Sequence, residues 1–131
     1  MNALKGNAIV GQSGGPTAAI NATLAGVIKG ALDSELIGKV YGMKNGIDGL
    51  LRDDVICLDG YFDCESAFEQ LKRTPAAALG SCRKKLPRLE EDDGTYEKLL
   101  NIFKFYSNTF FFPKKRYDFF CLCNTCILLC F

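Results

Sequence analysis

A glycine-rich segment near the N-terminus carries the strongest chemical signal in the sequence. It reads Gly11-Gln-Ser-Gly-Gly-Pro-Thr-Ala-Ala-Ile-Asn21 and follows a short apolar run at residues 7–10. Glycines between a strand and a helix let backbone N–H groups approach an anion, and the start of the helix adds further donors. Phosphate is the anion that suits such a turn. The spacing fits neither the dinucleotide nor the P-loop pattern, so a turn made by Gly14 and Gly15 without a ligand remains an equal alternative.

A second segment of small residues ends in an arginine. It reads Thr74-Pro-Ala-Ala-Ala-Leu-Gly-Ser-Cys-Arg83. The guanidinium of Arg83, presented by a compact loop, can bind phosphate oxygens in a bidentate manner, which a lysine does less well. By itself this signal is weak, because the basic residues at 83–88 are followed by the acidic run 90–93 and could form a solvated, charge-balanced stretch.

Composition limits the chemistry available to the chain. It has 131 residues, of which 48% are hydrophobic and 24% charged, which is ordinary for one globular domain. The formal net charge of +1 gives no overall field toward nucleic acid or an anionic membrane. Histidine is absent from the sequence, which excludes Ser-His-Asp hydrolysis, Cys-His chemistry and histidine-ligated zinc.

The elements that must position these segments follow from hydrophobic periodicity. The patterns predict strands near residues 7–10, 39–41, 55–58 and 109–112, a helix from Pro16 to Ala31, a helical turn at 47–51, a helix that starts near Asp63 or Ser66, and a helix after Asp93-Gly94. A strand, a helix and a second strand within about forty residues indicate a parallel strand-helix-strand unit. The predicted fold class is therefore α/β, with part of a doubly wound parallel sheet.

Three segments share a more specific pattern. They are residues 7–27, Gly46-Ile-Asp-Gly-Leu50 and Thr74-Pro-Ala-Ala-Ala-Leu-Gly-Ser-Cys-Arg83. Together they resemble the N-terminal part of a 6-phosphofructokinase, and most closely the pyrophosphate-dependent branch of that family. The resemblance covers about residues 5–112, whereas the catalytic chain of the family is several times longer. It implies the Rossmann-like first half of a phosphofructokinase N-terminal domain, in residues 1–112.

The resemblance also implies roles for particular residues. Gly14 is expected to lie against the phosphoryl donor, and Arg83 to reach the same phosphates; with Gly15 they form the predicted donor-phosphate site. In the family, a Gly-Gly-Asn/Asp-Asp-Ser loop holds Mg²⁺ and a Thr-Ile-Asp-x-Asp segment supplies the catalytic base. Neither motif occurs in this chain. No catalytic residue and no metal ligand is therefore predicted, although Mg²⁺ is the cofactor expected for the family.

The last residues, 113–131, do not follow the family pattern. They fit neither the alternation of a half-buried strand nor a capped amphipathic helix, and are predicted to be foreign to the fold. Four of the seven cysteines lie between residues 121 and 130. A four-thiolate metal site and peripheral membrane attachment are two minor alternatives. A reading-frame shift or misread intron accounts better for this Cys- and Phe-rich composition.

The resemblance implies an enzyme that transfers phosphoryl from pyrophosphate to fructose 6-phosphate in cytosolic glycolysis. Such enzymes form homo-oligomers, and neither nucleic acid nor a membrane is expected as a partner. Because the metal and base motifs are missing, we expect no turnover from this chain alone, and low solubility because its sheet is incomplete. Two alternatives stay open: a non-catalytic phosphate-binding or subunit-docking remnant, and a fragment of an ATP-dependent, nucleotide-binding phosphofructokinase.

Overall fold

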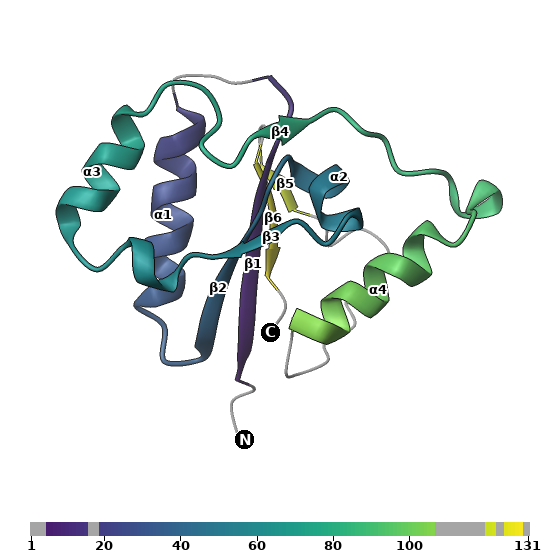
Figure 1. Ribbon diagram of the computed structural model, residues 1–131, viewed down its shortest axis with the longest axis horizontal. Helices are drawn as coiled ribbons and strands as arrows, with labels where there is room; N and C mark the ends of the chain where they lie inside the picture. The colour runs from purple at the N-terminus through teal and green to yellow at the C-terminus, as the bar shows by residue number, and fades with distance from the viewer. Residues whose placement is uncertain (1–4, 16–18, 107–119, 123–124, 130–131) are drawn as a thin grey trace.

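The chain forms a central sheet with helices on both faces (Figure 1). The computed structural model describes residues 5–15, 19–106, 120–122 and 125–129. The strands are β1 (Gly6–Ser13), β2 (Ile37–Met43), β3 (Val55–Cys57), β4 (Ser81–Cys82), β5 (Phe120–Leu122) and β6 (Thr125–Leu129). The α-helices are α1 (Ile20–Leu32), α2 (Gly46–Leu51), α3 (Glu65–Arg73) and α4 (Thr95–Tyr106), with short 3-10 turns at Asp59–Tyr61 and Leu89–Glu91. The α/β class predicted from the sequence is confirmed.

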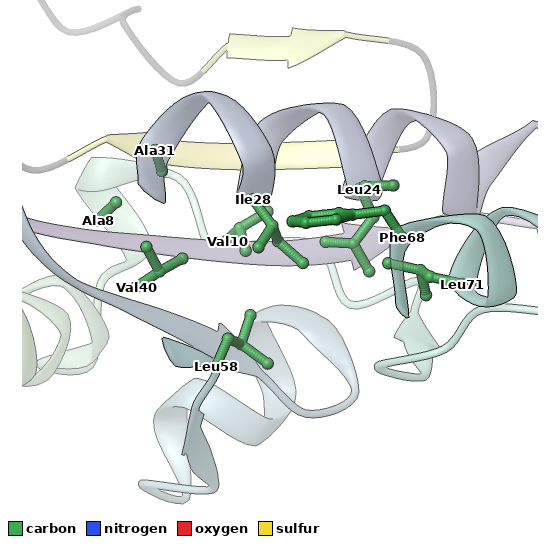
Figure 2. Packing of buried hydrophobic residues seen from close by; sticks show 10 residues of the cluster. Ala8, Val10, Leu24, Ile28, Ala31, Val40, Leu58, Phe68 and Leu71 are labelled. Carbon is green, nitrogen blue, oxygen red and sulfur yellow. The ribbon is translucent and has the colours of Figure 1, made fainter. Parts of the chain in front are cut away.

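Strand β1 is buried on both of its faces. Ala8 and Val10 belong to a hydrophobic cluster formed with α1 and α3, while Ile9, between them, belongs to a second cluster formed with α2 and α4. Successive side chains of a strand point to opposite faces of the sheet, so one apolar run serves both clusters. Figure 2 shows the first cluster, in which Leu24 and Ile28 of α1 lie over the sheet. β1 is therefore the central scaffold of the molecule.

The sheet is mixed rather than wholly parallel. β1 pairs in parallel with β2, as the sequence predicted, and also with β4. β3, however, runs antiparallel to β2, with Gly42 opposite Ile56. The chain between β2 and β3 contains only the short helix α2, which returns it along the same edge. A parallel crossover needs a dozen or more residues in its connection, so the expectation of an all-parallel sheet is corrected at β3.

The C-terminal segment contributes two strands, although the sequence predicted no regular element there. β5 and β6 form an antiparallel pair, and β6 runs antiparallel along β1, with Val10 opposite Ile127. The segment is rich in residues that favour strands. β1 pairs with β2 along one edge, and the backbone N–H and C=O groups of its opposite edge pair with β6. Period-2 alternation is absent from this segment, which is why the pattern alone did not indicate strands.

One predicted helix start is corrected and two others are confirmed. α1 begins at Ile20, with Ala19 as its N-cap, rather than at Pro16, which lies outside the described residues. α3 begins at Glu65, between Asp63 and Ser66, as predicted, and its N-cap is Cys64, which makes no side-chain capping hydrogen bond. The helix predicted after Asp93-Gly94 is confirmed as α4. The strand predicted at 109–112 lies outside the described residues.

The end of α4 is held to the sheet by Tyr106. Its hydroxyl donates to Asp53 Oδ1 at 2.8 Å, and its backbone carbonyl accepts from Asn7 Nδ2 at 2.6 Å. Its ring meets that of Tyr41 edge-on, with the ring centroids 5.0 Å apart. Burial, followed by the hydrogen bond to Asp53 and the charge of that carboxylate, raises the pKa of Tyr106 to about 12. The folded state therefore favours the protonated phenol.

This pKa predicts a loss of stability at alkaline pH. The pKa of an unfolded tyrosine is about 10, so the contribution of Tyr106 is complete below pH 10 and is lost as the pH rises through about 12. Tyr106→Phe removes this dependence. Urea unfolding of both chains between pH 8 and 12 should show the free energies of unfolding converging at high pH. A constant difference across that range would contradict the assignment.

Candidate anion-binding site

The two segments singled out in the sequence lie side by side. β4 continues in parallel alongside the end of β1, with Gln12 opposite Ser81 and Ser13 opposite Cys82. The Gly14 N–H donates to the carbonyl of Cys82 at 3.1 Å. In return, the hydroxyl of Ser81 donates to the carbonyl of Gly14 at 2.8 Å. Residues 67 positions apart in sequence thus form one compact loop cluster.

Arg83 lies directly beside Gly15. A Cβ built at Gly15 would stand 3.4 Å from the Nη2 atom of Arg83, so the guanidinium lies beside the space that a side chain at Gly15 would enter. The side chain of Arg83 is exposed, and none of the ion pairs found among the described residues involves it. A solvent-accessible guanidinium over a backbone turn can offer two parallel N–H donors to an oxyanion.

Gly14 has a different position from the one expected of an anion donor. Its φ of +83° lies in the left-handed region that favours glycine. Its N–H is already bound to Cys82, so that donor faces β4 in this structure. Gly14 therefore shapes the turn and joins it to β4 through its amide. The helix that was expected to begin beside the glycines starts later, at Ile20.

A second cation beside Arg83 is neutralised locally. Lys84 Nζ lies 3.2 Å from Asp48 Oδ1, and Arg52 lies 2.6 Å from the other oxygen of the same carboxylate. The hydrogen bond from Lys84, with the charges of both cations, holds the pKa of Asp48 below its usual range. Asp48 thereby links α2 to the chain just after β4. Of these two neighbouring cations, Arg83 is the one that forms no ion pair with another described residue.

The described residues do not fit a magnesium site. Within them, no group of three or more Asp, Glu or Cys side chains could hold a metal ion. Asp48, on α2, is already shared by two cations, which disfavours a third. Mg²⁺ binds through carboxylates together with substrate phosphates, so the described residues do not by themselves supply a site for this ion.

Two surface pockets lie away from Arg83. One, of about 340 Å³, is lined by the end of α2, by Arg52 just after it, and by residues of α4 that include Lys98 and Phe105. The other, of about 320 Å³, lies between the start of β1, β2 and the end of α4. Neither of these two pockets includes Gly14, Gly15 or Arg83. No helix in the described ranges has the length and apolar character needed to span a bilayer.

Two residues near this site were missed by sequence reasoning. Gln12 and Asn21 are buried amides that bind the backbone of the 74–79 loop, which leads into β4 and Arg83. A signal was present for Asn21, because this polar residue falls on the apolar stripe of α1 with Leu24 and Ile28. A polar side chain within such a stripe needs a hydrogen-bond partner.

Comparison with known protein families decides the family. The phosphofructokinase profile matches residues 7–108, which is most of the chain. The chain belongs to the phosphofructokinase family. The resemblance predicted from the three motifs is therefore confirmed. The match includes both Arg83 and the glycine turn.

Curated relatives of this phosphofructokinase chain carry one name. The chain is 43% identical over 107 residues to pyrophosphate–fructose 6-phosphate 1-phosphotransferase of Methylococcus capsulatus, covering 81% of this chain and 25% of the relative. It is 46% identical over 99 residues to the enzyme of that name from Xanthomonas campestris, covering 76% of this chain and 23% of the relative. The chain thus spans about a quarter of the length of the curated relatives it matches.

Solved structures agree with the family. The pyrophosphate-dependent phosphofructokinase of Nitrosospira multiformis superposes with a TM-score of 0.64 and 41% identity, covering 75% of this chain and 23% of that one. The enzyme of the same name from Marinobacter aquaeolei gives a TM-score of 0.61 and 38% identity, covering 77% and 23%. The α/β arrangement described above is therefore shared with phosphofructokinases.

Proposed function

We propose that this chain is the donor-phosphate-binding part of a pyrophosphate-dependent 6-phosphofructokinase, which transfers phosphoryl from pyrophosphate to fructose 6-phosphate. The observation that carries the proposal is the position of Arg83 beside the glycine turn. Its Nη2 atom would lie 3.4 Å from a Cβ added at Gly15. The names of the relatives supply the substrates. Cytosolic location, Mg²⁺ dependence and homo-oligomerisation stay predictions for the whole protein.

The residues present account for binding and charge stabilisation only. Phosphoryl transfer depends on positioning the phosphates and neutralising the charge on their oxygens. Arg83 supplies a delocalised positive charge at the glycine turn, and the β1–β4 pairing keeps the backbone that precedes Arg83 beside that turn. A carboxylate to orient the sugar hydroxyl and ligands for Mg²⁺ are separate requirements. Residues 1–131 contain neither family motif for them, so we propose that the chain alone binds the donor without turning it over.

Calorimetric titration with pyrophosphate tests this proposal. The unaltered chain should release heat on binding, and Gly14→Asp should bind at least tenfold more weakly, because a carboxylate at the turn repels the anion. Gly94→Asp is the matched control, since Gly94 also has a positive φ, of +92°, but lies away from Arg83 at the start of α4. Its affinity should equal that of the unaltered chain.

The same titrations separate the alternatives. Heat with ATP but not with pyrophosphate would assign the chain to an ATP-dependent phosphofructokinase. Heat with neither ligand would leave a folded remnant without a donor site. Formation of fructose 1,6-bisphosphate by the purified chain would overturn the proposal that it lacks turnover.

A further inference from the structure

Two buried side-chain amides lie beneath the predicted site. Gln12, near the end of β1, is 0% exposed, and Asn21, in the first turn of α1, is 1% exposed. Within the described ranges they are the two polar residues of the buried core. Burial of an amide is costly unless its hydrogen bonds are replaced. The partners of these amides therefore show what they are for.

Asn21 uses all four of its hydrogen-bonding positions. Its Nδ2 donates to the carbonyls of Thr74 and Ala76, at 2.7 Å each. Its Oδ1 accepts from the N–H of Ala78 at 3.0 Å and from Gln12 Nε2 at 3.0 Å. An amide group has two donors and two acceptor lone pairs. The side chain is thus saturated, and three of its four partners belong to the backbone of one loop.

Gln12 completes the connection. Its Nε2 also donates to the carbonyl of Ile20 at 3.3 Å, and its Oε1 accepts from the N–H of Leu79 at 2.9 Å. The pair therefore ties the end of β1 and the start of α1 to residues 74–79. Figure 1 shows that loop passing the N-terminal end of α1 before it enters β4.

The loop bound in this way is strained. Ala76 has φ of +60°, in the left-handed region that residues with a Cβ rarely adopt. Such a conformation persists where surrounding contacts impose it, and it is frequent at ligand-binding elements. The bond from Asn21 to the Ala76 carbonyl is one of those contacts. Four residues after the last clamped position, Leu79, the chain reaches Arg83.

We infer that Gln12 and Asn21 are positioning residues for anion binding, because their linked amides fix the 74–79 loop and so hold Arg83 over the glycine turn. This inference rests on the proposed function. Stability alone does not call for amides at these positions, since apolar side chains of similar shape would fill the same volume without a desolvation cost. What apolar side chains cannot do is set the path of a loop backbone through four directed hydrogen bonds, with one further link between the amides.

Amide exchange tests the positioning without any ligand. In Gln12→Met, the Leu79 N–H loses its acceptor, and in Asn21→Leu the Ala78 N–H does. Each amide should exchange at least tenfold faster in its variant, while the amides of residues 8–10 in β1 keep their protection. Ile28→Val is the control, because it trims the same core at the far end of α1 without touching the loop. Unchanged exchange at Leu79 and Ala78 in the two variants would overturn the inference.

Pyrophosphate affinity provides the second measurement. Both amide variants should bind at least tenfold more weakly at a temperature where each is folded, and Ile28→Val should bind within twofold of the unaltered chain. Faster exchange with unchanged affinity would also overturn the inference, because the loop would then be mobile without consequence for Arg83. Absence of binding by the unaltered chain would defeat the proposed function instead, and the exchange measurement would still decide whether the amides hold the loop.

Discussion

Replacing Arg83 with alanine should weaken pyrophosphate binding by roughly thirtyfold. The guanidinium lies beside Gly15 and is exposed to solvent, where it can form two charge-assisted hydrogen bonds with one phosphate. Loss of bonds of this kind costs about 2 kcal/mol, which corresponds to roughly thirtyfold in affinity. Calorimetric titration of the variant measures the change directly. The pyrophosphate affinity of Arg83→Lys should fall between those of the unaltered chain and Arg83→Ala, because a lysine keeps the charge but not the planar pair of donors.

Arg88→Ala is the control that decides between a site and a diffuse basic stretch. Arg88 is another exposed arginine of the same segment, five positions further along the chain. If Arg83 acts through its place beside the glycine turn, affinity in Arg88→Ala should stay within twofold of the unaltered value. Equal losses in the two alanine variants would favour the solvated basic stretch and remove the basis for the proposed site.

Replacing Gly49 with alanine should destabilise the chain by about 3 kcal/mol or more. The backbone carbonyl of Lys44 occupies the space that a Cβ at Gly49 would need. This clash would be between a Cβ atom and a backbone carbonyl, so no side-chain rotation can relieve it. α2 would therefore have to shift as a unit. That shift would displace Leu50, which is fully buried in the cluster shared with Met43 and Leu99. Urea unfolding, followed by far-ultraviolet circular dichroism, measures the loss.

The matched control is Gly26→Ala in α1. A Cβ at Gly26 meets nothing within 4 Å, and alanine is favoured over glycine inside a helix by about 1 kcal/mol. The control should therefore unfold at a higher urea concentration than the unaltered chain. A Gly49→Ala chain with the same unfolding midpoint as the unaltered one would show that α2 tolerates the side chain.

Gly49 shows that a glycine motif can be recognised in a sequence although its structural cause cannot. The Gly46-Ile-Asp-Gly-Leu50 segment was visible as part of a family pattern, but the reason for a glycine at position 49 is the nearby backbone carbonyl of Lys44. Contact between two backbone segments leaves no periodicity in a sequence. The backbone hydrogen bond of Gly14 leaves no pattern in the sequence either: its amide was expected to face a ligand and instead donates to Cys82.

The limits of strand prediction have a similar origin. Strand β1 was predicted at residues 7–10 because a strand buried on both faces has a continuous apolar run. Its extension to Ser13 depends on β4, a two-residue strand with no pattern of its own. The direction of β3 and the pairing of β6 depend on which edges of the sheet are open. Those edges exist only once the chain has folded.

By itself, the sequence determined the α/β class, the phosphofructokinase family and the two segments that carry Gly15 and Arg83, because periodicity and short motifs are local properties of a chain. Only the tertiary structure decided how these segments meet: through the β1–β4 pairing and the buried amides of Gln12 and Asn21. The physical reason is that hydrogen bonds between residues more than fifty positions apart depend on the path of the backbone in space, which no local pattern encodes.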